Sequence, residues 1–188
     1  MFRALLRIGA AVAVLGASPA FAFTDPFASG PIADFLTIFR QQGIPREVVA
    51  WRSGYAPGTV VVSTSQRRLY YVLGRDRAIR YGVGVGRQGF TWAGTKSVTM
   101  KREWPAWRPP PQMLKRRPDL PRHMPGGIEN PLGARAIYLG SSLYRIHGSN
   151  EPDTIGAAVS SGCIRMTNRD VMDLYERVRI GTKVVVVR

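Results

Sequence analysis

Hydrophobic and polar positions recur with different periods along the chain, and the first clear pattern is helical. Between residues 32 and 39 apolar side chains follow the spacing i, i+3, i+4, i+7, which forms one face of an amphipathic helix, and Gly43 is placed to end it. This face consists of Ile32, Phe35, Leu36 and Phe39. We therefore expect residues 23–57 to form a helical N-terminal extension that packs against the main domain.

From residue 59 onward the pattern is typical of strands. Residues 59–64 are almost all β-branched, residues 68–73 follow after a short polar turn, and apolar and polar residues alternate through 78–85. Such runs favour β-strands. Because the turns between them are short, the three runs predict an antiparallel meander.

The second half of the chain continues this pattern and adds one helix. Thr167 and Asp170 have the spacing of a helix capping box, and Gly181 is placed to end that helix. Further strands are predicted at residues 97–101, 134–139, 143–146 and 184–187. The fold class we expect is mainly β, with a few short helices.

Residues 103–133 interrupt the strand pattern with a high density of proline and tryptophan. Proline is excluded from central strands and from helix interiors. Long irregular segments inside a compact domain are commonly functional, so we interpret this one as a Pro/Trp-rich lid loop or the wall of a substrate groove. Trp104 and Trp107 are expected to pack within the lid, and His123 to lie on a surface loop.

The first 22 residues have the features of a signal peptide. Arg3 and Arg7 precede an apolar run, and Ala20 and Ala22 form an A-x-A cleavage site. The apolar run is shorter than the roughly 20 residues that span a bilayer, which disfavours the alternative of a retained anchor. We expect cleavage after Ala22, no stable membrane span afterwards, and a periplasmic or cell-envelope location.

The net charge of +15 indicates a strongly basic surface that attracts polyanions. Its short clusters, at residues 67–68 and 115–117, lack the interleaved aromatic side chains of a nucleic-acid platform. No nucleic-acid partner is therefore expected.

Cofactor and metal motifs are weak. Residues 84–89 fit G-x-G-x-x-G, but this dinucleotide pattern requires a following helix, whereas another strand is predicted here. Cysteine and histidine do not occur at metal-ligand spacing. We expect neither a metal nor an organic cofactor.

The chain has a single cysteine, Cys163, and therefore cannot form an internal disulfide. Exported proteins use cysteine mainly in disulfides. A lone cysteine is either a small buried hydrophobic residue or a reactive thiol, and composition alone leaves both open.

The residues around Cys163 suggest chemistry. His147 follows a predicted strand, Asp153 is placed to cap a helical turn reaching residue 159, and Ser-Ser-Gly at 160–162 turns sharply before the cysteine. An adjacent imidazole raises the thiolate fraction of a cysteine and so activates it as a nucleophile. One histidine and one cysteine sixteen positions apart nevertheless leave a purely structural role open.

Backbone N–H groups in such a turn can stabilise the oxyanion formed when a thiolate attacks a carbonyl carbon. The candidates are the N–H groups of Ser161, Gly162 and Cys163.

The same residues resemble the signature of the YkuD-type L,D-transpeptidase domain. His147-Gly148 is followed, after about a dozen residues, by Ser-x-Gly-Cys-x-Arg ending at Arg165, and the resemblance extends over residues 58–188. Other similar stretches are residues 82–86, 94–95, 130–133 and 181–186. Many members of the family have histidine where this chain has Ser161, which leaves the way Cys163 is held less well defined.

The resemblance implies a YkuD-like β-sandwich catalytic domain at residues 58–188. Cys163 would be the nucleophile, His147 the proton donor and acceptor, and Gly148 and Arg165 supporting residues. The expected substrates are peptidoglycan stem peptides: the thiol forms a thioester with the third residue, releases D-Ala, and transfers the acyl group to an amine.

Three acceptors of the acyl group remain open, as does one class of protein without catalytic activity. Another stem gives a 3-3 cross-link, an envelope protein lysine gives protein attachment, and water gives an L,D-carboxypeptidase or endopeptidase. A non-catalytic wall-binding envelope protein would fit the basic surface alone.

Overall fold

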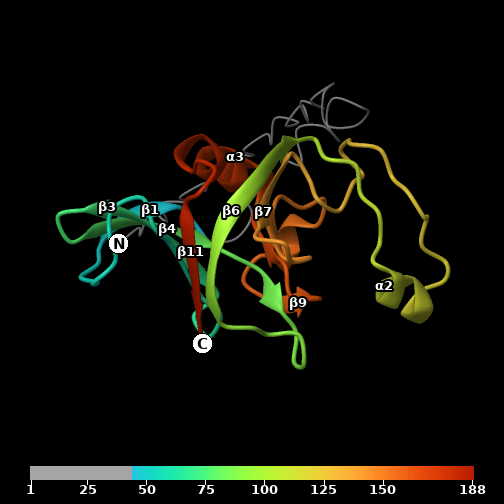
Figure 1. Ribbon diagram of the computed structural model, residues 1–188, viewed down its shortest axis with the longest axis horizontal. Coiled ribbons are helices and arrows are strands. Elements are labelled where there is room, and N and C mark those ends of the chain that lie inside the picture. The colour runs from blue at the N-terminus through green and yellow to red at the C-terminus, as the bar shows by residue number, and fades with distance from the viewer. Residues whose placement is uncertain (1–43) are drawn as a thin grey trace, which may run out of the picture.

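The structure, a computed structural model, describes residues 44–188 (Figure 1). The predicted signal peptide and the predicted helix at 32–39 lie outside the described residues. The described strands are β1 (Glu47–Ala50), β2 (Val60–Ser63), β3 (Arg68–Gly74), β4 (Arg77–Gly82), β5 (Val85–Gly86), β6 (Gly94–Glu103), β7 (Arg135–Leu139), β8 (Arg145–His147), β9 (Ala158–Ser160), β10 (Ile164–Arg165) and β11 (Lys183–Val187).

Nine of these strands form one mixed sheet in the order β1-β4-β3-β2-β11-β6-β7-β8-β10, and β5 pairs with β9. The predicted meander is confirmed, because β2, β3 and β4 pair antiparallel in sequence order. The final strand, β11, inserts parallel to β2 and antiparallel to β6.

The long strand β6 connects two halves of this sheet (Figure 1). Its first residues pair with β11, with Thr95 opposite Val185, and its later residues pair with β7, with Lys101 opposite Ile137. Buried side chains from both halves and from the helix α3 form one hydrophobic core, including Leu69, Tyr81, Val98, Ile137, Ile146, Ile164, Val171 and Leu174. This confirms the mainly β fold class.

The helix α3 (Asn168–Arg177) begins as predicted, since Thr167 Oγ1 accepts a hydrogen bond from the Asp170 N–H at 3.1 Å. It ends before Gly181, the predicted terminus, because Val178 is extended and buried in the core. Neither α3 nor the short helix α2 (Pro111–Arg116) in the described part of the chain has the length and apolar composition needed to span a bilayer.

Two predictions for the first half of the domain differ from the structure. The run at 78–85 divides into β4 and β5, because Gly84 leaves β3 and instead exchanges backbone hydrogen bonds with Arg165 at 2.8 and 2.9 Å. β1 lies within the segment expected to be helical and pairs antiparallel with β4. It is an edge strand whose residues are largely exposed, so it lacks the alternation that marks a half-buried strand.

The Pro/Trp-rich segment forms a separate lobe that carries α2, at the right of Figure 1. Two backbone hydrogen bonds of 2.8 Å between Trp107 and Met124 close its base. The buried Asn130 side chain donates to the carbonyls of Pro105 and Pro125 and accepts from the Leu132 N–H. These contacts hold an irregular segment without a long helix or a central strand.

Candidate active site

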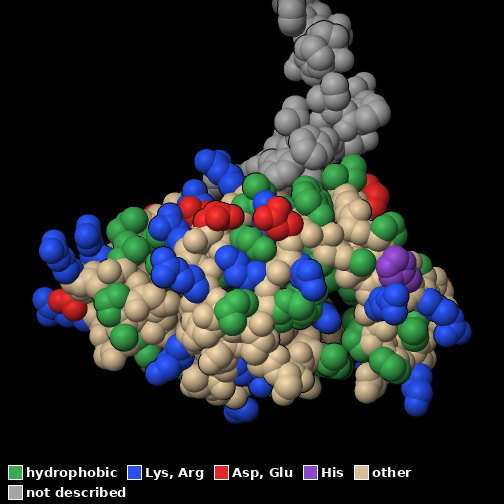
Figure 2. All heavy atoms as spheres, turned by 45° about the horizontal axis from the view of Figure 1, so that its top comes forward, with side chains coloured by type: hydrophobic (Ala, Val, Ile, Leu, Met, Phe, Trp, Pro, Cys, Tyr) green, Lys and Arg blue, Asp and Glu red, His purple; other side chains and the backbone are tan. Residues whose placement is uncertain are grey.

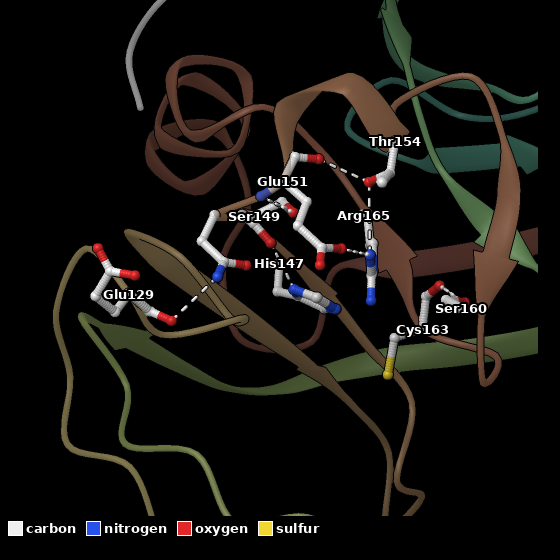
Figure 3. Close-up of polar contacts among 10 residues, drawn as sticks. Glu129, His147, Ser149, Glu151, Thr154, Ser160, Cys163 and Arg165 are labelled. Carbon is white, nitrogen blue, oxygen red and sulfur yellow. Dashed lines mark hydrogen bonds and ion pairs between the residues drawn. The ribbon is translucent and has the colours of Figure 1, made fainter. Parts of the chain in front are cut away.

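The predicted site residues meet where β8 and β10 run side by side. The two strands are parallel, with Ile164 opposite Ile146 and Arg165 opposite His147. Alternate residues of a strand point to opposite faces, so the two isoleucines enter the core. His147 and Arg165 face the other side, where Figure 3 shows Cys163 nearby.

The orientation of His147 is fixed by its neighbour in the chain. Its side chain is buried, and Nδ1 lies 2.6 Å from the Gly148 carbonyl oxygen. Because a carbonyl only accepts, Nδ1 must carry the proton, and Nε2 of the neutral ring keeps its lone pair. This leaves Nε2 as the nitrogen that can accept a proton.

The electrostatic surroundings keep this imidazole neutral. Burial lowers the pKa of His147 to about 3, and the positive charges of Arg165 and Arg145 add to the shift, whereas the hydrogen bond to Gly148 opposes it. A ring that is neutral at neutral pH keeps its lone pair for a proton, although so low a pKa makes it a weak base and its conjugate acid a strong proton donor.

Cys163 sits at the end of a turn that one hydroxyl holds together. Ser160 Oγ donates to the Cys163 carbonyl at 2.6 Å and accepts from the Gly162 N–H at 3.1 Å. Gly162 has φ +107°, and a Cβ there would lie 2.6 Å from the Tyr144 ring, so this position requires glycine.

An aromatic pair braces the same turn from outside. Trp92 Nε1 donates to the Gly162 carbonyl at 2.8 Å, and the Trp92 ring stacks on Tyr144 with centroids 4.6 Å apart. Lys96 Nζ lies 5.5 Å from the centroid of the Trp92 ring. Sequence reasoning identified Ser160 only as a residue of the turn and of the signature, without its hydrogen bonds. It missed the aromatic pair, whose only signal is two aromatic residues far apart in the chain.

The thiol of Cys163 is also neutral. Its Sγ lies 3.6 Å from the Leu143 carbonyl oxygen, the acceptor of its hydrogen bond. Burial raises the pKa of the Cys163 thiol, and this outweighs the opposing effects of the Arg145 backbone N–H and of the charges of Arg145 and Arg165. The site therefore rests as thiol and imidazole, and proton transfer between them has to accompany attack.

Only part of the expected oxyanion site is available. The Gly162 N–H already donates to Ser160 Oγ, so it is not free to bind an oxyanion. Within residues 44–188 the N–H groups of Ser161 and Cys163 donate no hydrogen bond. These two remain as candidate donors.

Arg165 is engaged by an acidic neighbour. Its guanidinium donates to Glu151 at 2.7 Å and lies 3.5 Å from Thr154 Oγ1 (Figure 3). The predicted helical turn reaching residue 159 is wrong: Pro152–Thr154 form a single 3₁₀ turn. Glu151, rather than Asp153, occupies its N-cap position, without a side-chain capping hydrogen bond. The chain is then extended as β9, because these residues pair with β5.

A cavity of about 700 Å³ brings these residues together beneath the lobe. In Figure 2 a hollow separates the body of the molecule from the lobe at the right. Trp107 lines this cavity, whereas His123 is exposed. Other lining residues are Phe90, Met113, Arg116, Arg117, Leu120, Tyr144, Arg145, His147, Glu151, Cys163 and Arg165.

Neither a metal centre nor a dinucleotide loop emerges from this arrangement. Residues 44–188 contain no group of three or more His, Cys, Asp or Glu side chains placed to hold a metal ion. The G-x-G-x-x-G pattern at 84–89 spans β5 and the loop before β6, and so lacks the helix that would bind a pyrophosphate.

Comparison with known proteins gives a consistent assignment. The family model of the L,D-transpeptidase catalytic domain, YkuD, matches residues 57–186. The probable L,D-transpeptidase ErfK/SrfK of Escherichia coli K12 is 38% identical over 161 residues, which cover 81% of this chain and 48% of that protein. The chain thus spans about half the length of the Escherichia coli relatives that it matches.

Solved structures show the same fold. An L,D-transpeptidase from Mycobacterium smegmatis superposes with a TM-score of 0.56 at 16% identity, covering 69% of this chain and 58% of that one. A Brucella melitensis protein described as a probable carnitine operon oxidoreductase is 43% identical, with a TM-score of 0.53, covering 80% of this chain and 98% of that one. With the family model matched over residues 57–186, this chain belongs to the L,D-transpeptidase catalytic domain family of the YkuD type.

Proposed function

We propose that this chain is a peptidoglycan L,D-transpeptidase in which Cys163 is the nucleophile and His147 the general base. The observation that carries the proposal is a neutral imidazole, held by Gly148, on the strand beside the turn that presents the thiol to the same cavity. A neutral base next to a thiol is the arrangement that cysteine acyl transfer uses.

In the first step the Cys163 proton moves to His147 Nε2 as sulfur attacks the carbonyl carbon of the third stem residue. The carbonyl becomes an oxyanion, for which the N–H groups of Ser161 and Cys163 are the donors. The carbon–nitrogen bond then breaks, the leaving nitrogen takes the proton from His147, D-Ala departs, and a thioester remains.

In the second step an amine attacks the thioester carbonyl and gives its proton to His147. The carbon–sulfur bond breaks, an amide forms, and sulfur regains the proton. An amine from another stem gives a 3-3 cross-link, and a lysine of an envelope protein gives protein attachment. With the proposed signal peptide at residues 1–22, this chemistry would take place in the periplasm.

Incubation of the purified chain with a disaccharide-tetrapeptide tests the proposal. We expect a cross-linked dimer and free D-Ala by mass spectrometry, and complete loss of both with Cys163→Ala, checked for folding by circular dichroism. Tripeptide monomer in place of dimer would identify a carboxypeptidase, and cleavage of a purified cross-linked dimer an endopeptidase. An unchanged tetrapeptide would contradict the proposal and favour a non-catalytic wall-binding protein. Full turnover by a folded Cys163→Ala variant would contradict the assignment of Cys163 as the nucleophile.

A further inference from the structure

Arg145 occupies the position on β8 two residues before His147, and therefore the same face of the strand. It stands opposite Tyr138 of β7, and its guanidinium carbon lies 5.0 Å from the centroid of that ring. Both Arg145 and His147 line the cavity that contains Cys163. The cavity that holds the proposed catalytic pair is therefore lined by the guanidinium of Arg145 as well as that of Arg165.

The two guanidiniums differ in their partners. Arg165 is paired with Glu151, whereas within residues 44–188 Arg145 forms no ion pair with a carboxylate. Arg145 Nε is in addition buried and has no hydrogen-bond partner in this part of the chain. An unpaired charge in a partly desolvated site is unfavourable unless an anion arrives to compensate it.

Other arginines show that the buried Nε alone does not distinguish Arg145. Arg80 and Arg135 also have a buried Nε without a partner, but their terminal nitrogens lie on carboxylates, Glu47 and Glu103 respectively. Arg135 even lies over a tyrosine ring, as Arg145 does. Of these three described arginines with a buried Nε, Arg145 alone lacks a carboxylate partner and lines the cavity.

We propose that Arg145 binds the carboxylate of the amino acid that leaves when Cys163 is acylated. This inference rests on the proposed function. The leaving nitrogen takes its proton from His147, and in an amino acid the carboxylate is attached to the carbon that bears this nitrogen. Side chains two residues apart on a strand lie about 7 Å from each other, so a leaving group next to the imidazole has its carboxylate within reach of Arg145.

A carboxylate-binding Arg145 would make the enzyme select its acyl donor by the carboxylate of the leaving residue. The acyl donor has to end with a free carboxylate one residue after the acylated carbonyl, so that a guanidinium can bind it through two charge-assisted hydrogen bonds. Stems amidated at this carboxylate, or extended beyond it, remove the charge from this position and become poor donors.

The test is a double comparison of two enzymes with two donors. Wild type and Arg145→Gln are assayed with the tetrapeptide as free acid and as C-terminal amide. A charge-assisted hydrogen bond contributes about 1.5–3 kcal/mol, so we expect wild type to prefer the free acid by roughly 10- to 100-fold in kcat/KM, mainly through KM. Arg145→Gln should lose this factor on the acid and change little on the amide.

The matched control is Arg135→Gln, which removes a guanidinium with a similar tyrosine contact that already has a carboxylate partner. It should keep the wild-type preference for the acid. Binding of both peptides to the Cys163→Ala chain, followed by calorimetry, should show the same preference without turnover, and Arg145→Lys should retain part of it.

Two outcomes would overturn the assignment to Arg145 while the transpeptidase proposal stands. One is an equal kcat/KM of wild type for the acid and the amide. The other is that the losses in kcat/KM from amidation and from Arg145→Gln are independent, so that the variant keeps the wild-type preference for the acid. A wild-type chain that is inert toward the free-acid tetrapeptide would overturn both.

Discussion

The strand that carries His147 and the turn that carries Cys163 face the same cavity but depend on different kinds of contact. β8 lies between β7 and β10, and the Met166 N–H donates to the His147 carbonyl at 2.8 Å. The turn instead depends on two side chains, the Ser160 hydroxyl and the Trp92 indole. Backbone hydrogen bonds are independent of side-chain identity, so the base should tolerate substitutions around it better than the nucleophile does.

Replacing His147 on β8 should cause the greatest loss of activity, and it should do so without changing the fold. His147→Gln keeps a polar side chain of similar size but cannot take the thiol proton. General-base catalysis contributes about 10²- to 10⁴-fold, so we expect a loss of that size in kcat/KM for D-Ala release, measured with the tetrapeptide. Because the backbone of β8 stays paired, the circular dichroism spectrum should be unchanged.

A variant that retained more than a tenth of wild-type kcat/KM would remove His147 from the mechanism. A variant that failed to fold would contradict the idea that the backbone ladder alone holds this strand.

Much of this strand architecture was predictable from local patterns. The β-branched runs gave the meander, and the spacing of Thr167 and Asp170 gave the start of α3. The contact between Trp92 and Gly162 joins residues 70 positions apart, and no local pattern encodes it. The same holds for the pairing of Gly84 with Arg165, which divides the third predicted strand.

The site shows the same division. The motif brought His147, Gly148, Cys163 and Arg165 to attention, and all four lie together in the structure. The hydrogen bond from the Gly162 N–H to the Ser160 hydroxyl could not be foreseen, because each of these groups had several alternative partners in the turn. Sequence patterns thus indicate which residues gather, whereas the allocation of each donor depends on three-dimensional packing.

Burial of the imidazole should also make the stability of the fold depend on pH. The imidazole of the unfolded chain titrates near 6.5, but in the folded chain the pKa of His147 falls to about 3. Below pH 6.5 the unfolded state therefore binds a proton that the folded state does not. The free energy of unfolding should decrease as pH falls from 6.5 toward 3, by up to about 1.4 kcal/mol per pH unit from this group.

Urea unfolding at pH 7 and pH 5 measures this effect, with His147→Gln as the variant that lacks the titrating group. Wild type should lose roughly 2 kcal/mol more than the variant between the two pH values. Parallel losses in the two proteins would mean that the ring is solvated in the folded chain, and the description of a neutral buried base would have to be abandoned.

The smallest expected effect concerns the turn. Ser160→Ala deletes the hydroxyl that donates to the Cys163 carbonyl and accepts from the Gly162 N–H. Leaving buried polar groups without a partner costs about 1–3 kcal/mol, and the freed turn presents the thiol in more than one position. We expect a loss of about 1–2 kcal/mol in the free energy of unfolding and roughly a tenfold lower rate of D-Ala release.

Ser161→Ala is the matched control, because it removes the neighbouring hydroxyl and leaves the backbone N–H of Ser161 in place as an oxyanion donor. Its stability should stay close to wild type. If instead Ser161→Ala destabilised the chain as much as Ser160→Ala, the turn would depend on the local serine pair rather than on the Ser160 hydroxyl. The specific role assigned to the Ser160 hydroxyl would then be contradicted, and the turn would be held by both serine side chains together with the Trp92 indole.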